Sequence, residues 1–294
     1  MILEYTSRLY SGTSSLTRLV SITHFDTKHN SYTIGKSAWS AMIWVMIIQY
    51  PTSHTWVKSV VADPLTGFGK NHTVRIKNTL KKITESNVTY RIEPLTPAII
   101  DWFTPLYTEM VGEKSNAKIS DIYTSTLGKE ANYPYNALIL LEAGIPIGAT
   151  IFSERKATLS FAYRIYPNHW QHNSLPAGPS LYAEYIINDY ASQKQFAKIS
   201  HGKDRNPYGY NAGIGLALFK LSVGCSIYLP NGQSDTASID LDAVTDDILV
   251  FAYPQADIKQ ISQAYLCVGH AAYEKYHSIT KYDHLVHTTI RLRD

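Results

Sequence analysis

The chain has 294 residues, of which 45% are apolar, so it can form at least one domain with a sizeable hydrophobic core, and a disordered protein is excluded. The formal charge of +3 and a charged fraction of only 17% show no general excess of cations of the kind that marks a nucleic-acid-binding chain. The two cysteines, Cys225 and Cys267, stand far apart, so we expect two buried, reduced thiols rather than a metal motif or a disulfide framework.

The N-terminal region gives no indication of export or of membrane insertion. Glu4 and Arg8 interrupt the apolar run that a secretory signal requires. The most apolar stretch, residues 38–50, is 13 residues long and contains Ser40 and Gln49, whereas a helix that crosses a bilayer needs about 20 apolar residues. We therefore expect a cytoplasmic protein with no membrane partner, in which this stretch is a buried core element.

Periodicity divides the chain into three parts. Residues 1–87 show no clear pattern and end in a basic run, so we treat them as an N-terminal flanking segment whose basic face is more typical of a solvated helix than of a docking surface. Residues 88–230 carry readable strand and helix patterns and form the expected main domain. Residues 231–294 are the third part, a C-terminal extension.

Apolar periodicity, helix caps and turn residues predict the elements of the main domain. In chain order they are a strand at 88–92, helices at 96–110 and 119–130, strands at 137–141, 147–152 and 158–166, a helix at 179–193, a strand at 196–200, a helix at 210–221 and a strand at 225–229. Short links between successive strands predict antiparallel hairpins in the centre of the sheet, and the later strand–helix–strand units predict crossover helices. The expected fold class is α/β (α+β) with a mixed sheet.

The C-terminal extension predicts a β-α-β unit. Its pattern indicates a strand at 248–252, a helix at 254–277 and a strand at 284–291. A unit of this size rarely folds alone. We therefore expect it to extend the main sheet or to pack with residues 1–87.

Several short motifs follow one another in the main domain. A hairpin sequence, LEAGIPIG, covers residues 141–148, and LPAGP at 175–179 precedes the predicted helix. Further along are ISHG at 199–202, Pro-Tyr at 207–208, and Phe-Lys at 219–220 with a glycine four residues later. Together with the element order, this succession resembles the GNAT acyltransferase superfamily, and within it the subgroup of Fem-type aminoacyl transferases and cellulose-locus acetyltransferases.

The resemblance covers residues 88–230, and it implies a GNAT-like sheet and an N-acyltransferase. Such an enzyme transfers an acyl group directly, without a covalent enzyme intermediate, from acetyl-CoA or another acyl-CoA to the amine of a small molecule, here an amino sugar or an amino acid. A homodimer is one assembly that we keep open.

Two alternatives remain beside this reading. A Fem-type relative takes its aminoacyl group from a charged tRNA, and such a chain would gather its cations in one groove; the candidates are Lys77, Lys81, Lys82, Lys203 and Arg205. The other alternative is a non-catalytic GNAT-like binding protein, because a fold alone does not fix a function.

The helix that begins at Pro179 is the candidate site for the phosphates of the donor. The first amides of a helix lack intrahelical acceptors, and the helix dipole favours an anion at that end. We therefore assign donor binding to the residues around this start, Ala177, Gly178 and Ser180, with His172 as a side-chain donor. Lys220 is a further candidate, since its ammonium group can contact an anion.

The resemblance places the reacting carbonyl at a gap between the strands predicted at 158–166 and 196–200. His201, at the end of the second strand, is the candidate general base because its ring titrates near neutral pH. Tyr208 is the candidate proton donor to the departing thiolate, and Glu184, on the helix, is a candidate buried acid. Alternation in the first strand predicts Phe161 on the same face as Tyr163 and Ile165, and Arg164 on the other face.

Histidine spacing does not favour a metal site. His169 and His172 lie in a polar loop without a second pair nearby, and His284 and His287 are spaced so that a strand would place them on opposite sides. We therefore predict no metal ligands.

Overall fold

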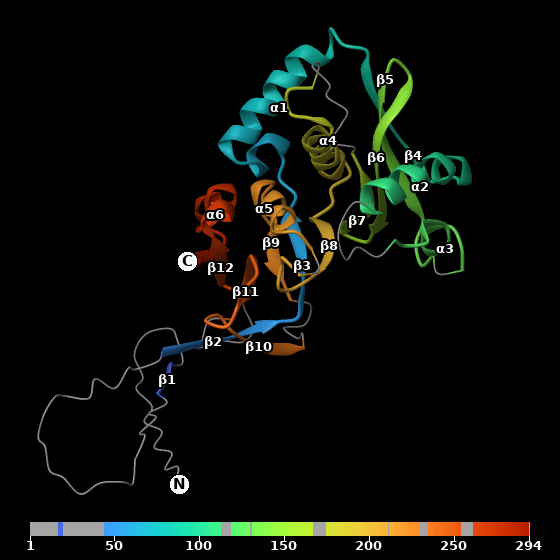
Figure 1. The fold of residues 1–294 in the computed structure, drawn as a ribbon. Helices are drawn as coiled ribbons and strands as arrows, with labels where there is room; N and C mark the ends of the chain where they lie inside the picture. The colour runs from blue at the N-terminus through green and yellow to red at the C-terminus, as the bar shows by residue number, and fades with distance from the viewer. Residues whose placement is uncertain are drawn as a thin grey trace, which may run out of the picture.

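The computed structural model describes residues 17–19, 44–112, 119–129, 131–166, 175–210, 212–229, 235–253 and 261–293 (Figure 1). Its largest sheet has seven strands in the order β4-β5-β6-β7-β8-β3-β9. These strands are β4 (Val88–Pro94), β5 (Tyr135–Glu142), β6 (Ile145–Arg155), β7 (Thr158–Ile165), β8 (Lys198–Arg205), β3 (Ser53–Ser59) and β9 (Ser226–Tyr228). β4 to β7 form an antiparallel meander, and β7 and β8 are parallel. The predicted fold class, a mixed sheet with central hairpins, is confirmed.

Helices cover both faces of this sheet. On one face, α2 (Pro97–Gly112) and α3 (Ile122–Thr126) bury Ile99, Phe103 and Ile122 against the sheet. On the other face lie α4 (Pro179–Gln193) and α5 (Ile214–Ser222), together with α1 (Lys70–Ile83). Because both faces are covered, β5 and β6 are continuous apolar runs. The predicted element order from residue 88 to residue 230 is the order observed.

The N-terminal segment contributes a central strand. β3 lies between β8 and β9 and pairs antiparallel with both, so residues 53–59 belong to the main sheet instead of flanking it. The inward positions of β3 are His54, Trp56 and Lys58, all buried. Two of these three are polar, and for this reason the alternation of the strand was not visible as an apolar pattern.

Two smaller sheets complete the fold. The first has the order β1-β2-β10, formed by β1 (Thr17–Leu19), β2 (Trp44–Pro51) and β10 (Thr236–Asp240). The second has the order β11-β12-β13, formed by β11 (Ile248–Ala252), β12 (Gln263–Gly269) and β13 (His287–Arg293), with β12 and β13 parallel. A backbone bridge between Tyr208 and Leu249 ties this second sheet to the loop after β8. None of the described helices is long and apolar enough to cross a bilayer.

The helix predicted at 254–277 is wrong over much of its length. Residues 263–269 form the strand β12, and only α6 (His270–Tyr276) is helical, followed by the 3-10 turns of η3 (His277–Tyr282); residues 254–260 lie outside the described part. β12 is almost entirely buried, and a short continuous apolar run fits a buried strand as well as a buried helix. The strand predicted at 248–252 is confirmed, and the one predicted at 284–291 begins three residues later, as β13.

Candidate functional site

The parallel strands β7 and β8 separate after a short contact. Their register includes three pairs only, from Thr158 with Lys198 to Ser160 with Ser200. Beyond this point β7 continues along β6, and β8 continues along β3. Each strand therefore has one edge that no described strand covers. Side chains already bond two backbone groups of β8 at this point: Ser200 Oγ accepts from the Gly202 amide at 3.4 Å, and Lys220 Nζ donates to the His201 carbonyl oxygen. The gap predicted between these two strands is confirmed.

A β-bulge in β7 sets which side chains face this gap. Phe152 pairs with Phe161 and Ile151 pairs with Tyr163, so Ala162 is an extra residue. A bulge of this kind shifts the side chains that precede it to the other face. The prediction that Phe161 and Tyr163 share a face is therefore wrong. The Phe161 ring packs on the α4 side of the sheet, with its centroid 4.6 Å from that of the His201 ring, whereas Tyr163 packs toward α2. Phe161 and Arg164 thus share the face that α4 covers.

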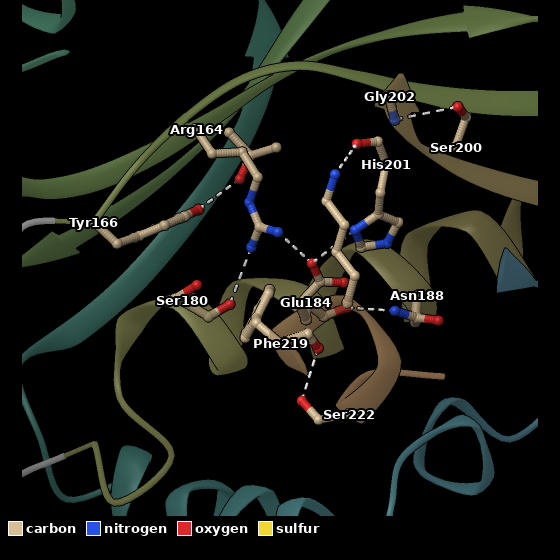
Figure 2. A network of polar contacts seen from close by, with 12 residues as sticks. Arg164, Tyr166, Ser180, Glu184, Asn188, Ser200, His201, Gly202, Phe219 and Ser222 are labelled. Atoms are coloured by element: carbon tan, nitrogen blue, oxygen red, sulfur yellow. Dashed lines mark hydrogen bonds and ion pairs between the residues drawn. The ribbon is translucent and has the colours of Figure 1, made fainter. Parts of the chain in front are cut away.

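Three charged or polar side chains meet where the strands separate (Figure 2). Arg164 of β7 forms an ion pair with Glu184 of α4 through Nη1 and Oε1, and its Nη2 donates to the Ser180 carbonyl oxygen at 3.2 Å. His201 of β8 places Nδ1 3.6 Å from the same Glu184 oxygen. The Glu184 side chain is fully buried and that of His201 is 2% exposed. The structure therefore brings together two of the predicted catalytic residues, Glu184 and His201, and adds Arg164.

Burial and charge fix the protonation of this group. Burial alone would raise the pKa of Glu184, but the positive charges of Arg164 and Lys58 and the hydrogen bond from Arg164 lower it below its usual value, so the carboxylate is ionised. Burial lowers the pKa of His201 to about 3 against the opposing attraction of Glu184. The ring is therefore neutral at pH 7, and its Nε2 has no hydrogen-bond partner among the described residues. The near-neutral titration expected of His201 is therefore wrong, and the ring is a weak base at pH 7 whose unpartnered nitrogen takes a proton only with the help of the Glu184 charge beside it.

A second buried cluster lies beside the first and centres on Asp204 of β8. Its Oδ2 accepts hydrogen bonds from Tyr208 at 2.7 Å, from Trp56 Nε1 at 2.9 Å and from Lys220 Nζ at 2.7 Å. His54 Nε2 lies 3.0 Å from the Tyr208 hydroxyl oxygen. Tyr208 is fully buried, and burial next to the Asp204 carboxylate raises its pKa far above the usual value. The hydroxyl proton predicted to reach the leaving thiolate is thus engaged inside the protein, and this role stays a prediction.

Lys220 joins the two clusters. Its Nζ pairs with Asp204 and also donates to the His201 carbonyl oxygen at 3.2 Å, directly after the last β7–β8 pair. The neighbouring Phe219 ring lies against the Arg164 guanidinium, 5.7 Å from centroid to Cζ. The anionic partner of Lys220 is therefore a carboxylate of the chain itself, and its predicted contact with a donor stays a prediction. Gly224 is the glycine that follows Phe219 and Lys220 in the sequence motif. Its φ is +87, and a Cβ there would lie 2.4 Å from the Gly67 carbonyl oxygen, so this position requires glycine.

The start of α4 is partly occupied by the chain itself. Ala177 donates its amide to Thr79 Oγ1 at 2.8 Å, and Gly178, with φ +75, donates to the Leu175 carbonyl oxygen at 2.7 Å. Neither amide is left for a phosphate. The amides of Ser180 and Leu181 precede the first bond of the helix ladder, which runs from Tyr182 to Gly178.

The remaining predicted donor-binding residue, His172, lies outside the described residues. In the described part of the chain, no group of three or more His, Cys, Asp or Glu side chains is arranged to hold a metal ion.

Sequence reasoning missed the contribution of β3. Trp56 and His54 complete the Asp204 cluster. Lys58 lies near Glu184. Its Nζ is 3.8 Å from the centre of the Phe68 ring and has no hydrogen-bond partner among the described residues. Alternation of His, Trp and Lys at every second position was the available signal, since large side chains spaced by two share one face of a strand.

Comparison with known proteins gives matches to solved structures alone. No family model matches the chain, and no curated protein matches it. A crystal structure of FemX is 13% identical and aligns with 59% of this chain and 59% of its own, with a TM-score of 0.45. A GCN5-related N-acetyltransferase from Anabaena variabilis is 14% identical over 65% of this chain and 41% of its own, with a TM-score of 0.37.

A third match is an aminoglycoside acetyltransferase from an uncultured soil metagenomic sample, which is 20% identical and aligns with 37% of this chain and 74% of its own, with a TM-score of 0.27. This chain thus spans about six tenths of the FemX chain and about half of an L-PGS from Bacillus licheniformis, of which 48% is covered. Likeness at this level says nothing of the activity of this chain.

Proposed function

We propose that the protein is an N-acyltransferase that moves an acyl group from acyl-CoA to the amine of a small molecule. One observation carries the proposal: β7 and β8 separate after Ser160 and Ser200, and a buried, ionised Glu184 and a neutral His201 lie at the point of separation. An uncovered strand edge offers backbone donors and acceptors to an extended ligand and to its polarised carbonyl. Polar side chains buried beside such an edge supply the proton chemistry.

The reaction needs one proton acceptor and one carbonyl-binding donor. The amine nitrogen attacks the thioester carbonyl carbon, a C–N bond forms, the C–S bond breaks, and the CoA thiolate leaves. His201 Nε2, which has no partner among the described residues, accepts the proton that the amine loses, and the thiolate takes a proton from water. Glu184, 3.6 Å from Nδ1, orients the ring and stabilises its charged form. A backbone amide at the uncovered edges stabilises the developing oxyanion.

The charged-tRNA alternative requires a single basic groove. Lys77, Lys81 and Lys82 lie on α1, which follows the end of β3, whereas Lys203 pairs in register with Thr55 near the start of that strand. Ser59 lies four residues after Thr55, about 13 Å along the strand. Arg205 pairs with Ser53, still nearer the start of β3, and Figure 1 shows α1 beyond the other end of that strand. The cations thus fall into two groups, and we favour acyl-CoA as the donor.

Thiol release tests the proposal. Acetyl-CoA, propionyl-CoA and longer acyl-CoA donors are offered with a panel of amino sugars and amino acids, and free CoA is measured. We expect turnover with at least one pair, a loss of about 100-fold in kcat for His201→Gln, and a smaller loss for Glu184→Gln. Tyr208→Phe tests the predicted proton donor, and Lys129→Gln, an exposed residue far along the chain from the site, is the control variant. Absence of thiol release with every donor, together with transfer from aminoacyl-tRNA, would overturn the choice of donor.

A further inference from the structure

Helix α1 concentrates positive charge. Its 14 residues contain Lys70, Arg75, Lys77, Lys81 and Lys82 and no acidic residue. The whole chain carries +3 and α1 alone carries +5, so the rest of the chain has a net negative charge. All five side chains are exposed, and no ion pair joins any of them to a described carboxylate.

Only part of this charge serves the helix itself: Lys81 and Lys82 stand in the last turn, where the helix dipole favours cations, whereas the other three cations do not. Lys70 stands in the first turn, where the helix dipole favours acidic residues, and that turn has none. Lys77 and Lys81 are four residues apart, a spacing at which like charges repel on a helix surface. A helix placed only to cover the sheet would mix the two signs of charge. The excess of cations along the whole helix, with no acidic residue among them, makes α1 a surface that attracts anions.

One side of α1 borders the start of α4. Arg75 donates from Nε to the Pro176 carbonyl oxygen at 3.2 Å and from Nη2 to the Ala177 carbonyl oxygen at 3.1 Å. Thr79, one turn on, accepts the Ala177 amide. Lys82 follows Arg75 by seven residues, two helical turns along the same side.

Residues Arg75, Asn78 and Lys82 form what we call the α1 flank. Lys70, Lys77 and Lys81 follow one another at intervals of seven and four residues, so they share a different stripe of the helix. Lysines thus stand both on the α1 flank and away from it. A substitution of a lysine away from the flank therefore serves as a matched control for the same substitution on the flank.

The start of α4 needs help to hold phosphate. Of its neighbouring amides, those of Ala177 and Gly178 are bonded within the chain, and residues 175–178, Leu-Pro-Ala-Gly, contain no cation. Glu184 lies five residues after Pro179, about 7 Å along the helix axis. The extended pantetheine arm of acyl-CoA is longer than this, so a donor with its thioester beside Glu184 and His201 would carry its phosphates past the start of α4 and toward the α1 flank.

We infer that the α1 flank, with Arg75 and Lys82 as its cations, binds the phosphate groups of the acyl donor. This inference rests on the proposed function, in which the donor is acyl-CoA. Arg75 Nε and Nη2 hold the Pro176 and Ala177 carbonyls in place, and among the described residues no hydrogen bond engages Nη1, which would contact the ligand. Lys82 supplies a mobile point charge one turn beyond Thr79.

The test compares two charge reversals on one helix and two donors. Lys82→Glu changes the α1 flank, and Lys77→Glu makes the same change on the other stripe. Each variant is assayed with acetyl-CoA and with S-acetylpantetheine, which has the thioester but no phosphates. We expect Lys82→Glu to lower kcat/KM for acetyl-CoA about tenfold and to leave S-acetylpantetheine unchanged, while Lys77→Glu has less than a twofold effect on either donor. Urea unfolding checks that both variants are folded.

Other outcomes overturn the inference. Equal losses for the two variants would mean unlocalised attraction to the helix, and no loss for Lys82→Glu would mean that the phosphates bind elsewhere. Calorimetric titration with adenosine 3′,5′-bisphosphate separates this inference from the proposed function. If the wild type releases no thiol, the function fails, but binding of the bisphosphate that Lys82→Glu weakens about tenfold would still support the phosphate site. A wild type that does not bind the bisphosphate contradicts the site whatever the activity.

Discussion

Replacement of Lys220 by Met tests the buried ion pair that joins α5 to β8. The Lys220 and Asp204 side chains are 8% and 14% exposed, and Nζ lies 2.7 Å from Oδ2. Met keeps most of the length of the side chain but removes the charge, so the Asp204 carboxylate retains only two neutral donors, Trp56 and Tyr208. Loss of one partner from a buried pair costs about 3–5 kcal/mol, and the two remaining hydrogen bonds offset part of it. We expect a loss of about 3 kcal/mol in the free energy of unfolding.

Urea unfolding at pH 7, followed by tryptophan fluorescence, measures this loss. Asp204→Asn and the double variant complete a double-mutant cycle, and the coupling energy between the two positions should be about 2 kcal/mol, because the second substitution removes the unpaired charge that the first one leaves. Lys220→Met should also lower kcat, since Nζ holds the His201 carbonyl oxygen. A loss below about 1 kcal/mol with no coupling would refute the reasoning, because it would show that water screens the pair.

Three further predictions concern buried groups. Burial lowers the pKa of His54 to about 4 and of His201 to about 3, so between pH 6.5 and 4 the unfolded chain binds protons that the folded chain does not. The urea midpoint should therefore decrease as the pH is lowered through this range, and it should decrease less steeply for His54→Gln. A midpoint that does not change with pH would contradict the burial of both rings. Burial also lowers the pKa of Lys58 to about 8, so the folded chain holds this ammonium at a cost below pH 8. Lys58→Met should therefore raise the free energy of unfolding by about 1–3 kcal/mol below pH 8, and this gain should shrink toward pH 10.5. A loss of stability at pH 7 would show instead that the ammonium has a favourable partner. Gly224→Ala should cost more than about 2 kcal/mol in the same assay, because its φ is +87 and its Cβ would meet the Gly67 carbonyl oxygen; a variant as stable as the wild type would mean that the two loops are free to separate.

The order of elements in the main domain was predictable because each element satisfies a local rule. Pro179 begins α4, Gly144 supplies a positive φ in the hairpin between β5 and β6, and the apolar runs of those strands are unbroken. β3 and β12 were not predicted from the sequence, for opposite reasons. β3 turns His54 and Lys58 inward, so its pattern is not apolar. β12 is an unbroken apolar run from Ala264 to Val268, and such a run does not separate strand from helix.

The candidate site was predictable in its residues but not in its contacts. Glu184 and His201 could be chosen from the sequence because they follow a predicted helix start and a predicted strand end in the resembling segment. The strand end itself was wrong, since β8 continues to Arg205 and His201 lies in its middle. The partners that set their protonation come from elsewhere: Arg164 reaches the same face as Phe161 only through the bulge at Ala162. A bulge changes the register by one residue and leaves no strong mark on the sequence.

The central claim is that the donor lies between the separating parts of β7 and β8. Hydrogen–deuterium exchange, with and without saturating acetyl-CoA, tests it directly, because the amides on an uncovered strand edge exchange freely until a ligand bonds to them. The account predicts slower exchange in peptides that contain residues 161–165 and 201–205, and in the first turn of α4, when acetyl-CoA is bound. Unchanged exchange in these three segments, under conditions in which acetyl-CoA binds or is consumed, would contradict the account.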